Sequence, residues 1–375
     1  MVQEKKEAEA QRIDLVLSMA PHMHAPQSVT SIMWMVVAAL LPATAYSVYL
    51  FGMKALLLVA ASVATAVASE AAYQFLMKKK VSVSDGSAVI TGLLLVMNVP
   101  PDAPVWMACI GSAFAIIIAK QLFGGVGFNI FNPALAGRAF LLASWPVYMT
   151  TKWYHFSENN ILSQGLSNGM GLPQAAFDAI TSATPLAALK GASKIITEMN
   201  VPAESFYNLI LSHDMLKSLF VGNIGGCLGE TSALFLLAGA AFLFYKRIIT
   251  WHVPLAYAGT VAVFMLIYYT FVRIPGTESI PFFTYRMVLF HLLSGGLALG
   301  VFFMATDMVT SPVTKSGMIV FGIGCGLLTC LIRLWGGYPE GVSYSILLMN
   351  AVVPLIDRVF KPRVFGTTGK DNSAS

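Results

Sequence analysis

Long apolar runs recur along almost the whole of this chain, and they restrict its possible folds more than any other feature. Most of them are about 17–25 residues long, the length that an α-helix needs to cross a bilayer. They do not alternate polar and apolar residues as the strands of a membrane β-barrel do. Hydrophobic residues make up 57% of the 375 positions and charged residues only 11%, whereas soluble domains carry about a quarter charged residues. The sequence therefore predicts an all-α, polytopic membrane protein.

About ten transmembrane helices are expected, in two sets of five. The first set falls at about residues 30–51, 54–77, 86–99, 104–123 and 130–147. The second set falls at about residues 230–246, 252–272, 285–304, 315–333 and 341–359. The chain then divides into an N-terminal segment (1–28), a first five-helix repeat (29–147), a polar region (148–229), a second five-helix repeat (230–359) and a C-terminal tail (360–375).

Basic residues at the ends of spans predict the orientation. Lys78–Lys80 follow the second span, Lys246 and Arg247 follow the sixth, and the C-terminal tail is basic. Cytoplasmic loops carry the excess of Lys and Arg, so a cytoplasmic N-terminus places all three clusters on the cytoplasmic side. Both termini are then cytoplasmic, and the polar region is extracytoplasmic. The first 28 residues lack the apolar stretch of a cleaved signal peptide, and the net charge of +5, spread over loops and ends, does not indicate nucleic-acid binding.

The two halves share a pattern of motifs. In the first half, Asn98–Pro104 precedes a span that ends in Phe123-Gly124-Gly125. In the second half, Thr306–Pro312 precedes a span that ends in Trp335-Gly336-Gly337. Five spans per repeat is an odd number, so the two repeats are expected to be inverted, an arrangement that commonly places a functional path at the repeat interface. The alternative is that any two membrane halves punctuated by Gly and Pro resemble each other.

Acidic residues near two short segments are the candidates for an ion path. The glycine-bearing segments at about 86–99 and 292–304 are the expected broken helices, and Asp85 and Asp307 lie next to them. Acids within a membrane are functional candidates by default, although acids at span ends are commonly just interfacial. Weaker candidates of the same kind are Glu70, Glu230 and Asp357. No metal site is expected, because the four cysteines form no C-x-x-C pair.

A polar motif in the long region between the two halves draws attention to Thr184. Thr184 precedes Pro185 and an Ala- and Leu-rich run that reads as a helix up to Glu198. Thr is a good N-cap residue and Pro favours the first helical position. The free N–H groups at the start of a helix also suit a phosphate. Taken alone, the motif predicts a capped helix in a loop.

Three motifs, in a fixed order, give the chain a family resemblance. They are Phe123-Gly124-Gly125-Val126-Gly127-Phe128-Asn129-Ile130-Phe131-Asn132-Pro133 with Arg138 after it, the stretch from Asp178 to Leu186, and Arg333-Leu334-Trp335-Gly336-Gly337-Tyr338-Pro339-Glu340-Gly341-Val342. With this set the chain resembles the D subunit of the Rnf complex, the ion-translocating ferredoxin:NAD oxidoreductase. It is also similar to the homologous B subunit of the Na+-translocating NADH:quinone oxidoreductase. The Trp-Gly-Gly-Tyr-Pro-Glu-Gly-Val form and the short N-terminal tail favour the Rnf type.

The resemblance implies a covalent cofactor. In that family a flavin transferase attaches FMN through a phosphoester to the final Thr of a Ser/Thr-x-Ala-Thr motif that follows an Asp. The matching residues are Asp178, Thr181, Ser182, Ala183 and the acceptor Thr184. The resemblance also implies a second, non-covalent flavin such as riboflavin in some members, to which no residues are assigned. For Arg138, snorkelling to the cytoplasmic interface and a contact with flavin or another subunit both remain open.

The expected role is that of an electron relay and a part of the ion path in a cytoplasmic (inner) membrane. The Gly124-Gly125-Val126-Gly127 run follows an apolar span rather than a strand, so it is not a Rossmann dinucleotide loop. We therefore expect NAD and ferredoxin to bind other subunits of the complex, with Na+ or H+ as the transported ion. An alternative is a small-solute channel or carrier with inverted repeats and no redox role, which the ten-span frame alone fits equally well.

Overall fold

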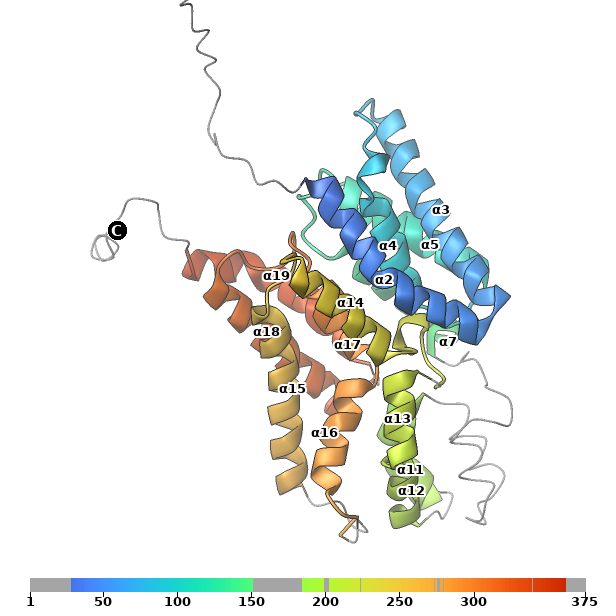
Figure 1. Cartoon of the computed structure of the whole chain (residues 1–375), viewed down its shortest axis with the longest axis vertical. Coiled ribbons are helices and arrows are strands. Elements are labelled where there is room, and N and C mark those ends of the chain that lie inside the picture. The colour runs from blue at the N-terminus through green and yellow to red at the C-terminus, as the bar shows by residue number, and fades with distance from the viewer. Residues whose placement is uncertain are drawn as a thin grey trace, which may run out of the picture.

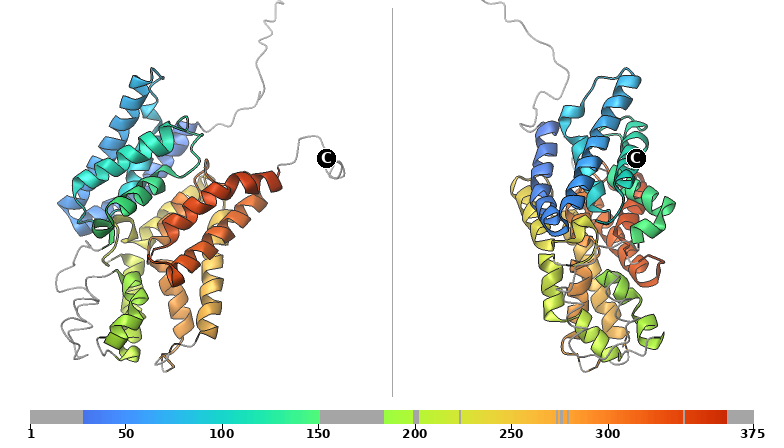
Figure 2. Two further views of the ribbon diagram at one scale, coloured as in Figure 1. Left: turned by 180° about the vertical axis from the view of Figure 1, so that it is seen from behind. Right: turned by 90° about the vertical axis from the view of Figure 1, so that its right-hand side faces the viewer.

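The computed structural model describes residues 28–150 and 184–361, apart from 199–201, 223, 273, 275–276, 279 and 339. All regular secondary structure in these residues is helical. The ribbon forms two helical groups, one from each half of the chain, and α10–α13 (residues 185–221) lie at one end of the molecule, far from the start of α2 at Val29 (Figure 1). The two further views show the same separation (Figure 2). The prediction of an all-α chain is confirmed.

The helices of the N-terminal group follow the expected spans closely at their starts. They are α2 (Val29–Phe51), α3 (Met53–Leu76), η1 (Val83–Asp85), α4 (Ser87–Met97), α5 (Val105–Ile116) with its π-helical continuation η2 (Ile117–Gln121), α6 (Pro133–Ser144) and α7 (Pro146–Thr150). Ser28 caps α2 by accepting a hydrogen bond from Ser31 N. The expected span 130–147 is divided into two shorter helices, α6 and α7. The division falls at Trp145 because a residue before proline is disfavoured in the helical conformation.

The remaining helices build the connecting region and the second group. The connecting region contains α10 (Pro185–Lys190), α11 (Ala192–Glu198), α12 (Ala203–Ile210), α13 (His213–Val221) and η3 (Leu228–Glu230). The second group contains α14 (Ala233–Tyr245), α15 (His252–Phe271), α16 (Phe283–Leu293), α17 (Leu297–Leu299) with its π-helical continuation η4 (Gly300–Met304), α18 (Lys315–Trp335) and α19 (Val342–Val359).

Five described helices are long and apolar enough to cross a membrane: α2, α3, α15, α18 and α19. A sixth span results if α16 and the α17–η4 segment, which meet at a 60° bend, are counted together. Apolar helices of 10–17 residues, α4, α5–η2 and α14, occupy three further expected positions. The last expected position, 130–147, contains the 12-residue α6. The protein is therefore a multi-pass membrane protein in which several of the expected spans are short helices.

Both expected broken helices start at a glycine in the left-handed conformation. Gly86 (φ 81°) precedes α4, and Gly296 (φ 64°) precedes α17. A residue with a side chain is strained at such positive φ values, so glycine is the residue suited to these two starts.

The two halves meet along two helix pairs, α2 with α14 and α6 with α19. In the first pair a Cβ added at Gly239 would lie 2.2 Å from the carbonyl oxygen of Ala39. Small residues of this kind let membrane helices approach closely. The contact therefore depends on glycine at position 239.

A buried ion pair organises the N-terminal group. Lys120, on the π-helical η2, places its Nζ 2.8 Å and 2.9 Å from the two carboxylate oxygens of Glu70 on α3. The side chains are 4% and 0% exposed. Gln121 Nε2 also donates to Glu70 (2.7 Å), and Lys120 donates to Ser87 Oγ (2.6 Å). The charges are therefore paired and hydrogen-bonded, as buried charges must be.

We expect Glu70→Gln or Lys120→Met alone to lower the free energy of unfolding by roughly 3–5 kcal/mol, because each leaves an uncompensated buried charge. The measurement is denaturant unfolding in detergent. The matched control is Lys54→Met. Lys54 pairs with Asp102, but the Lys54 side chain is 72% exposed, and exposed pairs contribute about 0–1 kcal/mol. Equal losses for both pairs would contradict this account.

Candidate functional site

Thr184 caps a helix, as its sequence context predicts. Its backbone is extended (φ −66°, ψ 152°), Pro185 follows at the first helical position, and its Oγ accepts a hydrogen bond from Ala187 N at 3.2 Å. The side chain is buried, with only 2% of the residue exposed. The other motif residues, Asp178, Thr181, Ser182 and Ala183, lie outside the described residues.

The helix that follows is shorter than expected. The single helix expected from Pro185 to Glu198 is wrong, because α10 ends at Lys190 and α11 starts at Ala192. Gly191 lies between them and caps α10, with its N–H bonded to the carbonyl oxygen of Ala187 at 2.9 Å. Glycine weakens a helix interior and favours its end. The cap on Thr184 is therefore the start of a helix of less than two turns.

Lys190 fastens α10 to the second half of the protein. Its Nζ donates to the carbonyl oxygens of Ile332 (3.2 Å) and Tyr338 (2.8 Å), and also to that of Gly336. Burial lowers the pKa of Lys190, whereas three carbonyl acceptors at the end of α18 favour the charged ammonium. Lys190 is thus a structural clamp rather than a solvated loop residue. Lys194, by contrast, lies on α11 in an exposed pair with Glu198 at 3.9 Å.

Thr184 lines a small cavity together with the break between α16 and α17. The cavity has a volume of about 10 Å³ and is also lined by Glu230, Ser294 and Gly295. A Cβ added at Gly295 would lie 2.6 Å from Leu186 Cδ2 and 3.0 Å from Arg333 Nη2. The start of α10 therefore packs directly on the Ser294–Gly296 turn, and the Arg333 guanidinium also lies close to Gly295.

Arg138 has its partner in the other half of the chain. Its guanidinium bonds to Glu340 and Ser343 at the start of α19, and to Asn98 Oδ1 at 3.3 Å. Arg138 and Glu340 are 8% and 9% exposed. This pair argues against snorkelling, because the side chain is buried and paired inside the protein. A contact of Arg138 with flavin or another subunit stays a prediction. Arg138 and Glu340 are 202 residues apart in the sequence, so one sequence alone does not indicate that they pair.

A thiol and two carboxylates gather beside this ion pair. Ligand atoms of Cys227, Glu230 and Glu340 lie within 4.8 Å of one another. Such a set can hold a divalent cation, but Arg138 already neutralises Glu340. Desolvation and the Glu340 carboxylate raise the pKa of Glu230, so the second carboxyl group tends to keep its proton. The Arg138–Glu340 ion pair, with the Glu230 carboxyl group beside it, accounts for the cluster without a metal.

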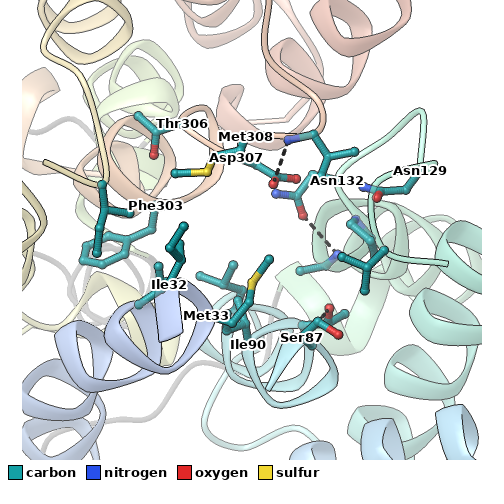
Figure 3. A pocket seen from close by; sticks show the side chains of 18 of the residues that line it. Ile32, Met33, Ser87, Ile90, Asn129, Asn132, Phe303, Thr306, Asp307 and Met308 are labelled. Carbon is teal, nitrogen blue, oxygen red and sulfur yellow. Dashed lines mark hydrogen bonds between the residues drawn. The ribbon is translucent and has the colours of Figure 1, made fainter. Parts of the chain in front are cut away.

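Of the two acids predicted for an ion path, Asp307 lines a cavity between the two halves, and Asp85 is hydrogen-bonded to a residue that lines it. This cavity, of about 110 Å³, is lined by Ser87, Lys120, Asn129, Asn132 and Asp307 among mainly apolar neighbours. Figure 3 shows Ser87 and Asp307 on opposite sides of it. Asp307 itself lines the cavity, whereas Asp85 acts through Ser87, whose N and Oγ donate to Asp85 Oδ1 at 2.8 Å and 2.6 Å. Since a water needs about 10–15 Å³, the cavity has room for several.

Phe206 and His291 both belong to the packing. The ring of Phe206 could in principle stack on a flavin, but it is 1% exposed and meets the Tyr207 ring edge-on at 5.5 Å. His291 Nε2 lies 3.1 Å from the hydroxyl of Tyr269 in the helix interior. Three further aromatic residues that could stack on a flavin, Trp153, Tyr154 and Phe177, lie outside the described residues.

Comparison with known proteins connects this geometry to a family. The sequence profile of the NQR2, RnfD, RnfE family matches residues 16–366. The chain belongs to this family. It is 46% identical over 356 residues to the D subunit of the Na(+)-translocating ferredoxin:NAD(+) oxidoreductase complex of Acetobacterium woodii, covering 95% of this chain and 96% of the relative.

Two further relatives cover nearly the same residues. Identity is 44% over 363 residues to the D subunit of the proton-translocating ferredoxin:NAD(+) oxidoreductase complex of Clostridium ljungdahlii, covering 96% of this chain and 99% of the relative. It is 42% over 347 residues to the D subunit of the ion-translocating oxidoreductase complex of Stutzerimonas stutzeri, covering 92% and 94%. The resemblance to the D subunit of the Rnf complex is thereby confirmed.

Lys190→Met is expected to loosen α10, because it removes the donor that holds three carbonyl oxygens at the end of α18. Hydrogen exchange followed by mass spectrometry checks this. Amides of residues 186–190 should exchange about tenfold faster in the variant, since a hydrogen bond from a charged donor contributes about 1.5–3 kcal/mol. The matched control is Lys194→Met, whose side chain is 72% exposed. Unchanged exchange in both variants would contradict the clamp.

Proposed function

We propose that this chain is the membrane subunit of an Rnf-type complex that carries FMN on Thr184 and relays electrons between ferredoxin and NAD, coupled to Na+ or H+ transport. The observation that carries the proposal is the capped, buried Thr184 in a chain that belongs to the NQR2, RnfD, RnfE family. Its relatives are named as D subunits of ferredoxin:NAD(+) oxidoreductase complexes. In such a complex, ferredoxin and NAD would bind to other subunits. This chain would contribute to the complex without a complete NAD site of its own.

The residues around Thr184 fit a phosphoester. The hydroxyl oxygen lies at the start of a helix, beside backbone N–H groups, and Ser294 Oγ lines the same cavity. FMN would supply the electron transfer, while the protein holds it in place and tunes its potential. Because only 2% of Thr184 is exposed, the flavin transferase would have to reach the hydroxyl before α10 packs on α16 and α17. The motif residues Asp178 and Thr181–Ala183 would serve as its recognition sequence.

The orientation belongs to the same proposal. Helices α11–α13, which follow Thr184 in the chain, lie far from the start of α2 (Figure 1). A cytoplasmic N-terminus, as the basic clusters predict, would therefore place this connecting region towards the extracytoplasmic side of the membrane. Two inverted five-helix repeats would then account for the left-handed glycines that start both α4 and α17.

The ion path would use the cavity between the two groups of helices. Asp307 of the second half and the Asp85–Ser87–Lys120 chain of hydrogen bonds in the first half meet there. Burial raises the pKa of Asp307, although Val309 N and Thr310 Oγ1 donate to its carboxylate. A polar cavity at the junction of two repeats is where transporters of this construction place their ion sites. The second, non-covalent flavin remains without assigned residues.

Thr184→Ala is the direct test of the attachment. Coexpressed with a flavin transferase, the wild-type chain should show a fluorescent band on a denaturing gel, and Thr184→Ala should lose it completely, because no other hydroxyl is expected to accept the phosphoryl group. Thr184→Ser should keep it. A non-fluorescent wild-type band would refute the proposal, and solute flux through the purified chain alone would support the carrier alternative.

The transported ion is tested on the whole complex in vesicles. If the ion is Na+, uptake driven by ferredoxin oxidation should persist with a protonophore present, because the protonophore dissipates only the proton gradient. If it is H+, the protonophore should abolish uptake. Asp307→Asn is expected to reduce ion uptake by at least about tenfold with the covalent flavin retained, since it removes the charge that lines the cavity. Full uptake by Asp307→Asn would remove Asp307 from the path.

A further inference from the structure

The turn between α16 and α17 contains a buried hydroxyl with no partner. Ser294 is 2% exposed, and among the described residues its Oγ has no hydrogen-bond partner. A buried hydroxyl without a partner costs free energy comparable to a lost hydrogen bond. Ser294 lines the cavity that Thr184 also lines. A ligand atom in this cavity would satisfy it.

The surroundings of Ser294 suit an anion. The Arg333 guanidinium donates to the carbonyl oxygens of His291 (2.5 Å) and Ser294 (2.8 Å), and its Nε has no partner among the described residues. Gly295 and Gly296 both have positive φ (66° and 64°), which turns the backbone sharply at this point. Positive charge therefore lies next to the turn that contains Ser294, a residue of the cavity lining.

The one acid in the cavity lining does not oppose an anion. Desolvation and the Glu340 carboxylate raise the pKa of Glu230, so its carboxyl group favours the protonated, uncharged form. A hydrogen bond between the Glu230 and Glu340 carboxyl groups also raises this pKa. Ser294 is then the hydroxyl donor in the cavity lining that is free to bind an anion.

The size of the cavity limits what can enter it. At about 10 Å³, it accommodates about one water-sized atom. A phosphoryl oxygen on the Thr184 phosphoester is of that size, whereas a whole flavin ring is not. The phosphoryl group would reach in with one oxygen, and the rest of the cofactor would lie outside the cavity.

We propose that Ser294 binds a phosphoryl oxygen of the flavin phosphoester on Thr184, with Arg333 supplying the positive charge behind it. This assignment rests on the proposed covalent FMN. Ser294 is a binding residue for the phosphate and takes no part in forming the bond. It fixes the phosphate against the α16–α17 break and thereby fixes the cofactor relative to the second half of the protein.

Three variants of the full chain, each coexpressed with the flavin transferase, test the assignment. Ser294→Ala removes the hydroxyl, and Ser294→Thr keeps it. Ser47→Ala is the matched control, because Ser47 is 1% exposed and its Oγ also has no partner among the described residues, but it lies on α2. Two readouts are used: the phosphorus NMR shift of the phosphoester, and the rate at which a phosphodiesterase releases flavin from the folded protein.

Ser294→Ala should keep its flavin, shift the phosphorus resonance towards that of a solvated diester, and release flavin at least about tenfold faster, because one hydrogen bond to a charged group is lost. Ser294→Thr and Ser47→Ala should behave as the wild type. A Ser294→Ala chain without flavin beside a loaded Ser294→Thr chain would contradict the assignment, because Ser294 would then be required for attachment.

Wild-type values for Ser294→Ala in both readouts would overturn the assignment and leave a water molecule as the partner of Ser294. An unloaded wild-type chain is a different result. It would overturn the covalent flavin itself and, with it, any phosphate for Ser294 to bind.

Discussion

The ion pair between Arg138 and Glu340 is the interaction on which the joining of the two halves depends. Arg138 lies on α6 of the first half and is buried, so its charge needs a partner wherever the helix packs. Glu340 and Ser343 of the second half provide that partner, and Asn98 of the first half completes it. Breaking such a pair leaves an unpaired buried charge, which is far costlier than losing an exposed contact. The pair therefore favours one arrangement of α6 against α19.

The segment just before α19 also holds the region that contains Thr184. Glu340 follows the Gly336–Tyr338 segment whose carbonyl oxygens bind Lys190 of α10. A shift of the start of α19 against α6 would thus move the acceptors of Lys190 as well. Under the proposed function, the cofactor attachment point and the interface between the halves would be mechanically linked through fewer than ten residues, which is a short physical route for coupling.

Local signals in the sequence predicted local structure well. The Thr184-Pro185 cap, the glycine starts near Gly86 and Gly296 and the positions of the apolar helices all depend on neighbours a few residues away. The break at Gly191 was missed because an Ala- and Leu-rich run outweighed one glycine. The pairs Arg138–Glu340 and Lys120–Glu70 were missed for a different reason. Each joins distant residues, and only the packed helices bring them together.

Under the proposed function, the choice of ion would depend on a few side chains rather than on the fold. Relatives named for Na+ and for proton transport are 46% and 44% identical to this chain over nearly its whole length. Overall similarity therefore carries no preference for either ion. A hard cation such as Na+ requires several oxygen ligands at once, whereas a proton needs one titratable group. The cavity at Asp307 offers a carboxylate and the amide groups of Asn129 and Asn132, but also the Lys120 side chain. Pairing of Lys120 with Glu70 keeps that positive charge compensated. Under the proposed function, the orientation of those amide oxygens relative to Asp307 would decide between the two ions.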